Sequence, residues 1–332
     1  MVLPHRPNGK FYIITNDLGA RVESLRTLGL KTPDADDHLF VSFHDETKRL
    51  IAGYLPDVQV ISYDMRSLAE QVWMEAIKLQ GTIKDAVVIS TCVELASSRR
   101  GHILEANRVF DEHGKMIGLG PRPGNTSLQS QINGVSAVVN GSPVVLAEDG
   151  AFTGDTIVTL LRLFKKRRVT VSVVVVGICF PGAKEAIEKE FDGKICVISE
   201  IDHPYEWMPD HDFIPFAPNC GRVFGGSFGE EILPHYTHES FSYCFPYVLP
   251  FGDPVEWASI PKEHAPNFSA FCLEQSLSLF RRLDEMNGKK IRMIDLLGST
   301  PRVSAPMTKG SNQLPNVDGP ISDFLAEVIH EF

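Results

Sequence analysis

Residues 144–163, VVLAEDGAFTGDTIVTLLRL, carry the pattern that decides the fold. Four apolar residues predict a buried strand that ends at Glu148 and Asp149. A short loop with glycine and threonine follows, and helical spacing begins near residue 155. The N–H groups at the start of a helix have no partner within the helix, so they form a ready site for an anion. The stretch therefore predicts a strand, an acidic turn and a phosphate-binding loop.

Short apolar runs, rich in valine and isoleucine, recur along the first two thirds of the chain. Such runs are typical of strands covered on both faces, and hence of a mostly parallel sheet. We expect strands at 11–15, 38–43, 58–62, 86–90, 135–139, 144–147, 170–177 and 195–199. We expect helices at 65–79, 155–167, 183–191 and 268–286. The alternation of strand and helix from 144 to 199 predicts a doubly wound α/β core.

The character of the sequence divides the chain into three parts. Residues 1–80 are expected to form an N-terminal α/β extension, and residues 81–202 the core. Residues 203–332 begin with a stretch dense in Pro, Gly, His and aromatic residues, whose aromatic content is too high for a solvated chain. We expect this last part to form a hood over one end of the sheet, where a substrate or a partner is held.

The overall composition argues against several functions. The 332 residues carry a formal net charge of −10, so no broad basic surface for nucleic acid is expected. The longest apolar run, 171–180, is too short to span a membrane, and the N-terminus lacks the apolar core of a signal peptide. The six cysteines show no metal-binding spacing, which favours reduced thiols and a cytoplasmic location.

Glu148 and Asp149 stand where the ligands of parallel sheets bind, beyond the carboxyl end of a strand. Ionised carboxylates accept hydrogen bonds from hydroxyl groups, so this pair suits a cis-diol. Gly154 permits close approach of the backbone to an anion, and Thr153 and Thr156 offer hydroxyl donors. A diol site next to a phosphate site has the dimensions of a ribose 5-phosphate. An acidic turn with a threonine cap and no ligand is the structural alternative.

The string of apolar residues, two acids, three variable residues and T-G-x-T resembles the ribose-phosphate motif of the type I phosphoribosyltransferases. The resemblance implies the α/β core of that family and binding of phosphoribosyl pyrophosphate (PRPP). It assigns Glu148 and Asp149 to the ribose hydroxyls, as catalytic residues and as ligands of Mg²⁺. It assigns the 5′-phosphate to the loop that follows, namely Gly150, Ala151, Phe152, Thr153, Gly154, Asp155 and Thr156. The implied reaction transfers ribose 5-phosphate to a nitrogenous acceptor and releases pyrophosphate.

Two further elements of that family have candidate positions here. A pyrophosphate loop would follow the strand at 86–90, at Thr91, Cys92 and Val93, although a plain strand–helix connection fits these residues as well. A flexible lid would occupy residues 108–126, for which an exposed hairpin is the alternative. This segment offers basic side chains and a histidine, namely Arg108, His113, Lys115 and Arg122.

The hood of the family holds the acceptor, and residues 202–226 follow the last core strand here. Trp207 or Phe213 would bind the acceptor by stacking on its ring, and Asp210 or Asp212 would accept hydrogen bonds from its edge. Packing in a core is the alternative for these aromatic residues.

Two residues of the motif are unusual. Phe152 occupies the position where hypoxanthine-guanine enzymes of the family carry an acid, so a 6-oxopurine acceptor is disfavoured. Asp155 complements the dipole of the helix that it begins, but it would repel a phosphate if its side chain faced inward.

Three functions are therefore open. The first is a phosphoribosyltransferase that uses PRPP and Mg²⁺. The second is a sensor or regulator of the same fold that binds PRPP or a nucleotide without transfer, and the third is a nucleoside or nucleotide hydrolase. The expected partners are PRPP or a nucleotide, a small-molecule acceptor and, in a homodimer, a second copy of the chain.

Overall fold

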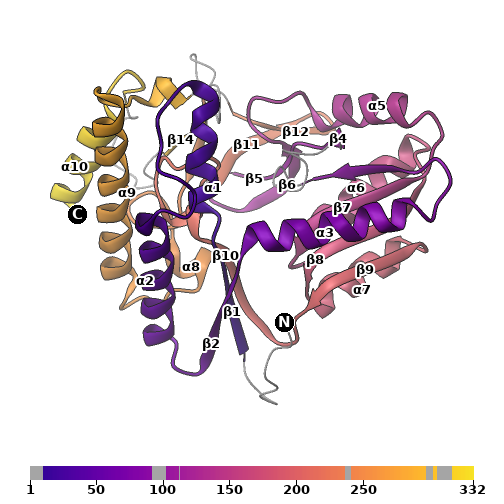
Figure 1. Cartoon of the computed structure of the whole chain (residues 1–332), viewed down its shortest axis with the longest axis horizontal. Helices are drawn as coiled ribbons and strands as arrows, with labels where there is room; N and C mark the ends of the chain where they lie inside the picture. Colours follow the sequence, from indigo (N-terminus) through magenta and orange to yellow (C-terminus); the bar gives the residue numbers. More distant parts are fainter. Residues whose placement is uncertain (1–9, 92–101, 112, 236–240, 297–301, 305–315) are drawn as a thin grey trace.

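The computed structural model describes residues 10–91, 102–111, 113–235, 241–296, 302–304 and 316–332. Its strands form three sheets. In Figure 1 the molecule has two lobes, with one sheet and its helices on the right. Helices α2 (His38–Tyr54), α9 (Ala265–Asn287) and α10 (Ile321–Glu331) form the left lobe.

The sheet of the right lobe has five strands in the order β4-β3-β7-β8-β9, and all of its pairings are parallel. The strands are β3 (Val87–Ser90), β4 (His102–Ile103), β7 (Val144–Ala151), β8 (Val171–Cys179) and β9 (Lys194–Glu200). Helix α6 (Asp155–Lys166) joins β7 to β8, and α7 (Pro181–Glu190) joins β8 to β9. This arrangement confirms the predicted α/β class with a mostly parallel sheet.

Alternate residues of β7 enter two different hydrophobic cores. Val144 and Leu146 pack in the core that contains α5 (Leu128–Val139), α6 and α7. Val145 and Ala147 pack in the core that contains α3 (Met65–Gln80), which crosses in front of β7 and β8 in Figure 1. The sheet is therefore covered on both faces, which explains why β7 reads as a continuous apolar run.

Two of the predicted strands are wrong. Residues 38–43 begin α2, and residues 135–139 end α5. The buried residues of α2 are Phe40, Phe43, His44, Thr47 and Ile51, and those of α5 are Leu128, Ile132, Val135 and Val139. Both sets recur at the helical period, which a window of five or six residues is too short to reveal.

A second sheet, β10-β1-β2, joins the N-terminal part of the chain to the hood. It contains β1 (Lys10–Thr15), β2 (Val58–Tyr63) and β10 (Pro204–Pro209), all parallel. One hydrophobic core holds Tyr12 and Phe43 together with Phe213 and Phe268. Residues of the predicted extension and of the predicted hood therefore share a sheet and a core, while the division at 80/81 and 202/203 stays a prediction.

The third sheet is mixed and has the order β14-β13-β11-β5-β6, with β12 paired to β11. Its strands are β5 (Ala106–Phe110), β6 (Met116–Pro121), β11 (Arg222–Phe228), β12 (Glu231–Pro234), β13 (Ser242–Phe245) and β14 (Arg302–Ser304). The segment predicted as a lid thus supplies an antiparallel hairpin, β5–β6, whose first strand pairs with β11.

The remaining elements are short: α1 (Leu18–Glu23), α8 (Pro254–Ala258), and the 3₁₀ helices η1 (Ser24–Leu28), η2 (Asp210–Phe213) and η3 (Met293–Leu296). The helix predicted at 268–286 is confirmed as α9. Within the described ranges, no helix combines the length and the apolar character needed to cross a bilayer.

Candidate active site

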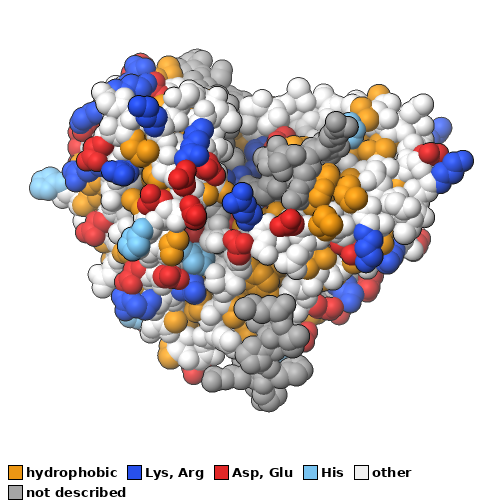
Figure 2. Space-filling model, viewed as in Figure 1, with side chains coloured by type: hydrophobic (Ala, Val, Ile, Leu, Met, Phe, Trp, Pro, Cys, Tyr) orange, Lys and Arg blue, Asp and Glu red, His pale blue; other side chains and the backbone are white. Residues whose placement is uncertain are grey.

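A polar cavity of about 200 Å³ lies where the five-stranded sheet, the β5–β6 hairpin and the hood meet. The core contributes Thr91, Glu148, Asp149 and Thr156. The hairpin contributes Ala106, Asn107, Arg108, Phe110 and Leu119, and Arg122 follows it. The remaining lining residues are Arg21, His211, Asp212, Asn219, Gly221, Arg222 and Tyr247. Figure 2 shows acidic and basic side chains together in the hollow between the two lobes.

The strand β7 and the helix α6 place the acidic pair and Thr156 on the same wall of the cavity. Glu148 and Asp149 belong to the last part of β7, and Thr156 lies in the first turn of α6. Gly154 precedes α6 with a φ of 82°, and a Cβ there would lie 2.9 Å from the carbonyl oxygen of Ala183. The turn that joins strand to helix therefore requires glycine at this position.

The carboxyl group of Glu148 is held in an unusual environment. Its Oε2 atom is buried and has no hydrogen-bond partner among the described residues. Burial, and then the neighbouring carboxylate of Asp149, raise the pKa of Glu148 well above its ordinary value of 4.5. Arg122 and Arg108 oppose this effect by lowering the same pKa. A cation bound at this carboxylate would favour its ionised form and so lower the pKa of Glu148.

The loop after the acidic pair turns most of its side chains away from the cavity. Thr153 donates a hydrogen bond from its hydroxyl to Oδ2 of Asp155 at 2.8 Å, and both residues are exposed. Phe152 is 39% exposed and packs against the edge of Phe180, with ring centroids 4.8 Å apart. Of the seven residues assigned to the 5′-phosphate, only Thr156 lines the cavity, and a phosphate bound elsewhere on the loop would meet backbone groups.

The predicted pyrophosphate loop is described only in part. Thr91 lies at the end of β3, is buried and lines the cavity, and its N–H donates to the carbonyl oxygen of Ala147 at 3.1 Å. Cys92 and Val93 lie outside the described residues.

Four arginines line the cavity. Arg122 forms an ion pair with Glu105, with Nε 3.0 Å from Oε2. Arg108 and Arg222 have no carboxylate within ion-pair distance among the described residues. His113 and Lys115, the two other predicted residues of the hairpin, do not line the cavity. Their backbone N–H groups donate hydrogen bonds to Oδ1 of Asp111.

The two aromatic residues predicted to bind the acceptor do not line the cavity. The ring of Trp207 packs against the backbone of Gly150, so closely that a Cβ added at Gly150 would be 1.9 Å from the ring. The same ring also meets the edge of Phe180, with centroids 6.2 Å apart. Phe213 is fully buried and packs edge-on against Phe268 at 5.0 Å. The structure therefore places both in packing positions, and Asp212 is the predicted hood residue that reaches the cavity.

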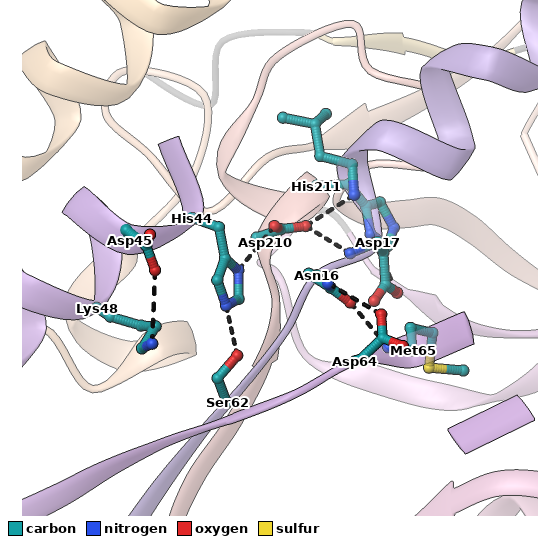
Figure 3. Close-up of polar contacts among 11 residues, drawn as sticks. Asn16, Asp17, His44, Asp45, Lys48, Ser62, Asp64, Met65, Asp210 and His211 are labelled. Carbon is teal, nitrogen blue, oxygen red and sulfur yellow. Dashed lines mark hydrogen bonds and ion pairs between the residues drawn. The ribbon is translucent and has the colours of Figure 1, made fainter. Parts of the chain in front are cut away.

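A buried polar network anchors the turn that carries His211 and Asp212 (Figure 3). Oδ1 of Asp210 accepts hydrogen bonds from the N–H groups of Asp17 and Leu18, both at 2.8 Å. Its Oδ2 atom lies 3.0 Å from Nδ1 of His44. Burial raises the pKa of Asp210, while the hydrogen bond with His44 lowers it. Asp210 thus ties η2 to α1 and α2 and does not line the cavity.

The outer end of this network is Ser62, whose Oγ lies 2.6 Å from Nε2 of His44. The order of Ser62, His44 and Asp210 is that of a nucleophile, a base and an orienting acid. Ser62 is exposed on β2, and the cavity described above does not include it. We therefore assign the network to positioning the hood against the N-terminal elements.

The two residues that follow Asp210, His211 and Asp212, line the cavity. Nδ1 of His211 lies 3.5 Å from Oδ2 of Asp17, and Nε2 lies 3.7 Å from Oδ1 of Asp212. The same Oδ1 accepts a hydrogen bond from the N–H of Gly221 at 2.6 Å. This bond positions the segment that leads into Arg222.

Sequence reasoning missed most of the wall opposite the core, called the hood wall below, which is formed by residues of the hood and by Arg21 of α1. Arg21, His211, Asn219, Arg222 and Tyr247 line the cavity without belonging to any motif. By its sequence context, His211 is a surface or packing histidine, since no metal-binding spacing surrounds it. Arg222 follows Cys220 and Gly221 in a stretch that offers no signal of its function.

The chain matches no protein-family model and no curated protein. Among solved structures, it is similar to TT1426 from Thermus thermophilus, with 17% identity over 42% of this chain and 84% of the other, and a TM-score of 0.27. It is also similar to the adenine phosphoribosyltransferase from Thermoanaerobacter pseudethanolicus, with 16% identity over 40% of this chain and 79% of the other, and a TM-score of 0.27. A third similar structure is AQ2163 from Aquifex aeolicus, with 14% identity over 55% of this chain and 84% of the other, and a TM-score of 0.26. Likeness of this degree assigns neither a family nor an activity.

Proposed function

We propose that this protein is a phosphoribosyltransferase-type enzyme, which transfers ribose 5-phosphate from PRPP to a nitrogenous acceptor and releases pyrophosphate. One observation carries the proposal. Glu148, Asp149 and Thr156, which the motif assigns to ribose and phosphate, line the same cavity as Thr91, the described part of the candidate pyrophosphate loop. The groups of PRPP would then be bound side by side at the carboxyl ends of β3 and β7.

Each part of this wall has a role in the proposed reaction. The carboxylates of Glu148 and Asp149 would accept hydrogen bonds from the ribose hydroxyls. The 5′-phosphate would lie at the N-terminus of α6, where free N–H groups and the helix dipole favour an anion. The bond between the anomeric carbon and pyrophosphate breaks, a bond from that carbon to an acceptor nitrogen forms, and the acceptor loses a proton. Positive charge that develops on the sugar is stabilised by the nearby carboxylates.

The donor set at the acidic pair fits Mg²⁺. No group of three His, Cys, Asp or Glu residues that could hold a metal occurs in the described part of the chain. Mg²⁺ does not require such a cage, since it often binds through one or two carboxylates together with phosphate oxygens and water. The buried Oε2 of Glu148, which lacks a hydrogen-bond partner among the described residues, is a suitable oxygen ligand. Bound there with PRPP, the ion would neutralise charge on the leaving pyrophosphate.

Calorimetric titration with PRPP and Mg²⁺, compared with nucleoside monophosphates, tests the proposal. We expect the wild-type protein to bind PRPP and, with a suitable base, to release pyrophosphate. Asp149→Asn should lower the rate of pyrophosphate release by about 100-fold or more, because it removes a charge beside the reacting carbon. Asp57→Asn, on an exposed side chain, is the matched control and should behave like the wild type.

The other two functions predict different results. PRPP binding without turnover by any base would favour the sensor. Cleavage of nucleotides with water as the only acceptor would favour the hydrolase. A wild-type protein that binds no ribose phosphate would refute the transferase and the sensor.

A further inference from the structure

The guanidinium group of Arg222 is held in a cage of aromatic rings at the hood side of the cavity. Its central carbon lies 4.5 Å from the ring centroid of Phe110, 4.2 Å from that of Trp257 and 5.3 Å from that of Tyr247. Nη1 donates to the carbonyl oxygen of Gly114 at 2.9 Å. Nε lies 3.4 Å from the hydroxyl of Tyr247. The side chain is therefore fixed in orientation before any ligand arrives.

Among the described residues, Arg222 forms no direct ion pair, and Glu206 is a carboxylate that interacts with its charge only at longer range. The side chain of Arg222 is half-buried, and no carboxylate of the described residues lies within ion-pair distance. Three aromatic faces and a carbonyl oxygen offset part of the charge, but they do not form the bidentate pair that a guanidinium makes with a carboxylate or phosphate. A half-buried guanidinium in this setting would gain two charge-assisted hydrogen bonds from an anion that a ligand supplies.

A second arginine stands next to it. In the parallel pairing of β11 with β5, Val223 lies opposite Val109, so Arg222 and Arg108 occupy neighbouring positions with the same orientation relative to the sheet. Both line the cavity, and Arg108 likewise has no carboxylate within ion-pair distance among the described residues, although it interacts at longer range with Glu148 and Glu206. The two strands thus present two positive charges to the same space.

Arg222 comes from a different part of the fold than the groups that the proposed function uses for PRPP. Glu148, Asp149, Thr156 and Thr91 belong to the five-stranded sheet and the helix after it, whereas Arg222 belongs to the mixed sheet of the hood. The hood also contributes Tyr247, Asn219 and Asp212 to the cavity wall. These polar side chains are suited to the edge of a small acceptor.

We infer that the acceptor carries an acidic group, a carboxylate or a phosphate, which Arg222 binds with the help of Arg108. This inference rests on the proposed function, because it identifies the anion as part of the acceptor. A neutral acceptor would offer no anion to Arg222. An acceptor with a carboxylate or a phosphate would accept the remaining hydrogen bonds of the Arg222 guanidinium group. The site should therefore discriminate acids from their neutral analogues.

The experiment uses pairs of probes that differ only in charge. Nicotinate is compared with nicotinamide, orotate with uracil, and inorganic phosphate serves as a minimal anion, all titrated into the full-length protein loaded with PRPP and Mg²⁺. We expect at least one acid to bind about tenfold or more tightly than its neutral partner. Arg222→Gln should reduce that preference to less than about twofold while PRPP affinity stays within about twofold.

Two further variants separate binding from folding. Arg222→Lys keeps the charge and loses the planar fork, so we expect it to retain part of the preference. Arg282→Gln, on the exposed face of α9, is the matched control and should retain all of it. Circular dichroism melts show which variants are folded, and Arg222→Lys carries the test if Arg222→Gln unfolds.

Two results with the wild type would overturn the inference: equal binding of acids and their neutral analogues, or no binding of any probe. Two results with Arg222→Gln would also overturn it: an unchanged preference for the acid, or a loss of affinity for PRPP as large as the loss of affinity for the acid. The last result would place Arg222 in the PRPP site. If the protein instead bound acids through Arg222 but never bound PRPP, the proposed function would fail and the anion site would stand.

Discussion

The two walls of the cavity are built in different ways. On the core wall, Glu148, Asp149 and Thr156 come from one strand–turn–helix unit, 144–166. On the hood wall, Arg21 and Arg222 come from segments that are far apart in the chain. The first wall depends on local backbone geometry, whereas the second depends on long-range packing. A contiguous motif can therefore be recognised without its surroundings, whereas a composite wall cannot.

The largest expected effect concerns the packing of the hood wall. Asp210→Ala would leave the N–H groups of Asp17 and Leu18 and the imidazole of His44 without their acceptor. Unsatisfied buried donors are costly, so we expect a loss of about 3 kcal/mol in the free energy of unfolding, measured with urea.

Ser62→Ala is the matched control for this network. It removes the outer hydrogen bond to His44 from an exposed side chain, so it should cost about 1 kcal/mol or less. If Asp210→Ala cost no more than Ser62→Ala, the hood wall would not depend on this anchor, and the contrast between the two walls would be lost.

The next effect concerns the core wall. Gly150→Ala would place a Cβ 1.9 Å from the ring of Trp207, and overpacking of this kind costs about 1–3 kcal/mol. The smaller ring in Trp207→Phe should reduce that cost, which a double-mutant cycle of urea unfolding measures.

The matched control is Gly134→Ala. Residue 134 lies in helix α5 with open space around it, so this substitution should instead stabilise the protein by up to about 1 kcal/mol. Equal costs of Gly150→Ala in both backgrounds, the wild type and Trp207→Phe, would show that Trp207 does not restrict residue 150.

The smallest expected effect is the pH dependence of stability that arises from Glu148 in the core wall. The pKa of Glu148 is raised above 4.5 in the folded protein, mainly by burial. Its stabilising contribution is therefore complete below about pH 4.5 and is lost as the pH rises through the folded pKa. Glu148→Gln stays neutral, so its stability relative to the wild type should increase between about pH 5 and pH 8 in the absence of ligand.

Thermal melts at several pH values measure this difference. Glu263→Gln, on an exposed side chain, should follow the wild type at each pH. Because a bound cation favours ionised Glu148, binding of PRPP with Mg²⁺ should also release a proton, which calorimetry in two buffers detects. A difference between Glu148→Gln and the wild type that does not change with pH would contradict the environment described for this carboxyl group.

Sequence reasoning could predict the fold class and the residues of the core wall because both depend on local signals. The apolar run of β7, the acids at its end and the glycine before α6 lie in one stretch, and their geometry follows from strand and helix formation alone. The same reasoning placed strands at 38–43 and 135–139, because short apolar windows do not distinguish a strand from one face of a helix. It also chose Trp207 and Phe213 for their chemistry, although the packed structure decides that Phe213 is buried and Trp207 partly buried.

The sequence alone determined that two acidic residues and the N-terminus of a helix stand at the end of a buried parallel strand. Only the tertiary structure decided what faces them. Pairing of β11 with β5 brings Arg222 beside Arg108, and the contacts of Asp210 hold η2 against α1 and α2. Such contacts join residues far apart in the chain, and their free energy comes from burial and hydrogen bonding that no local pattern records.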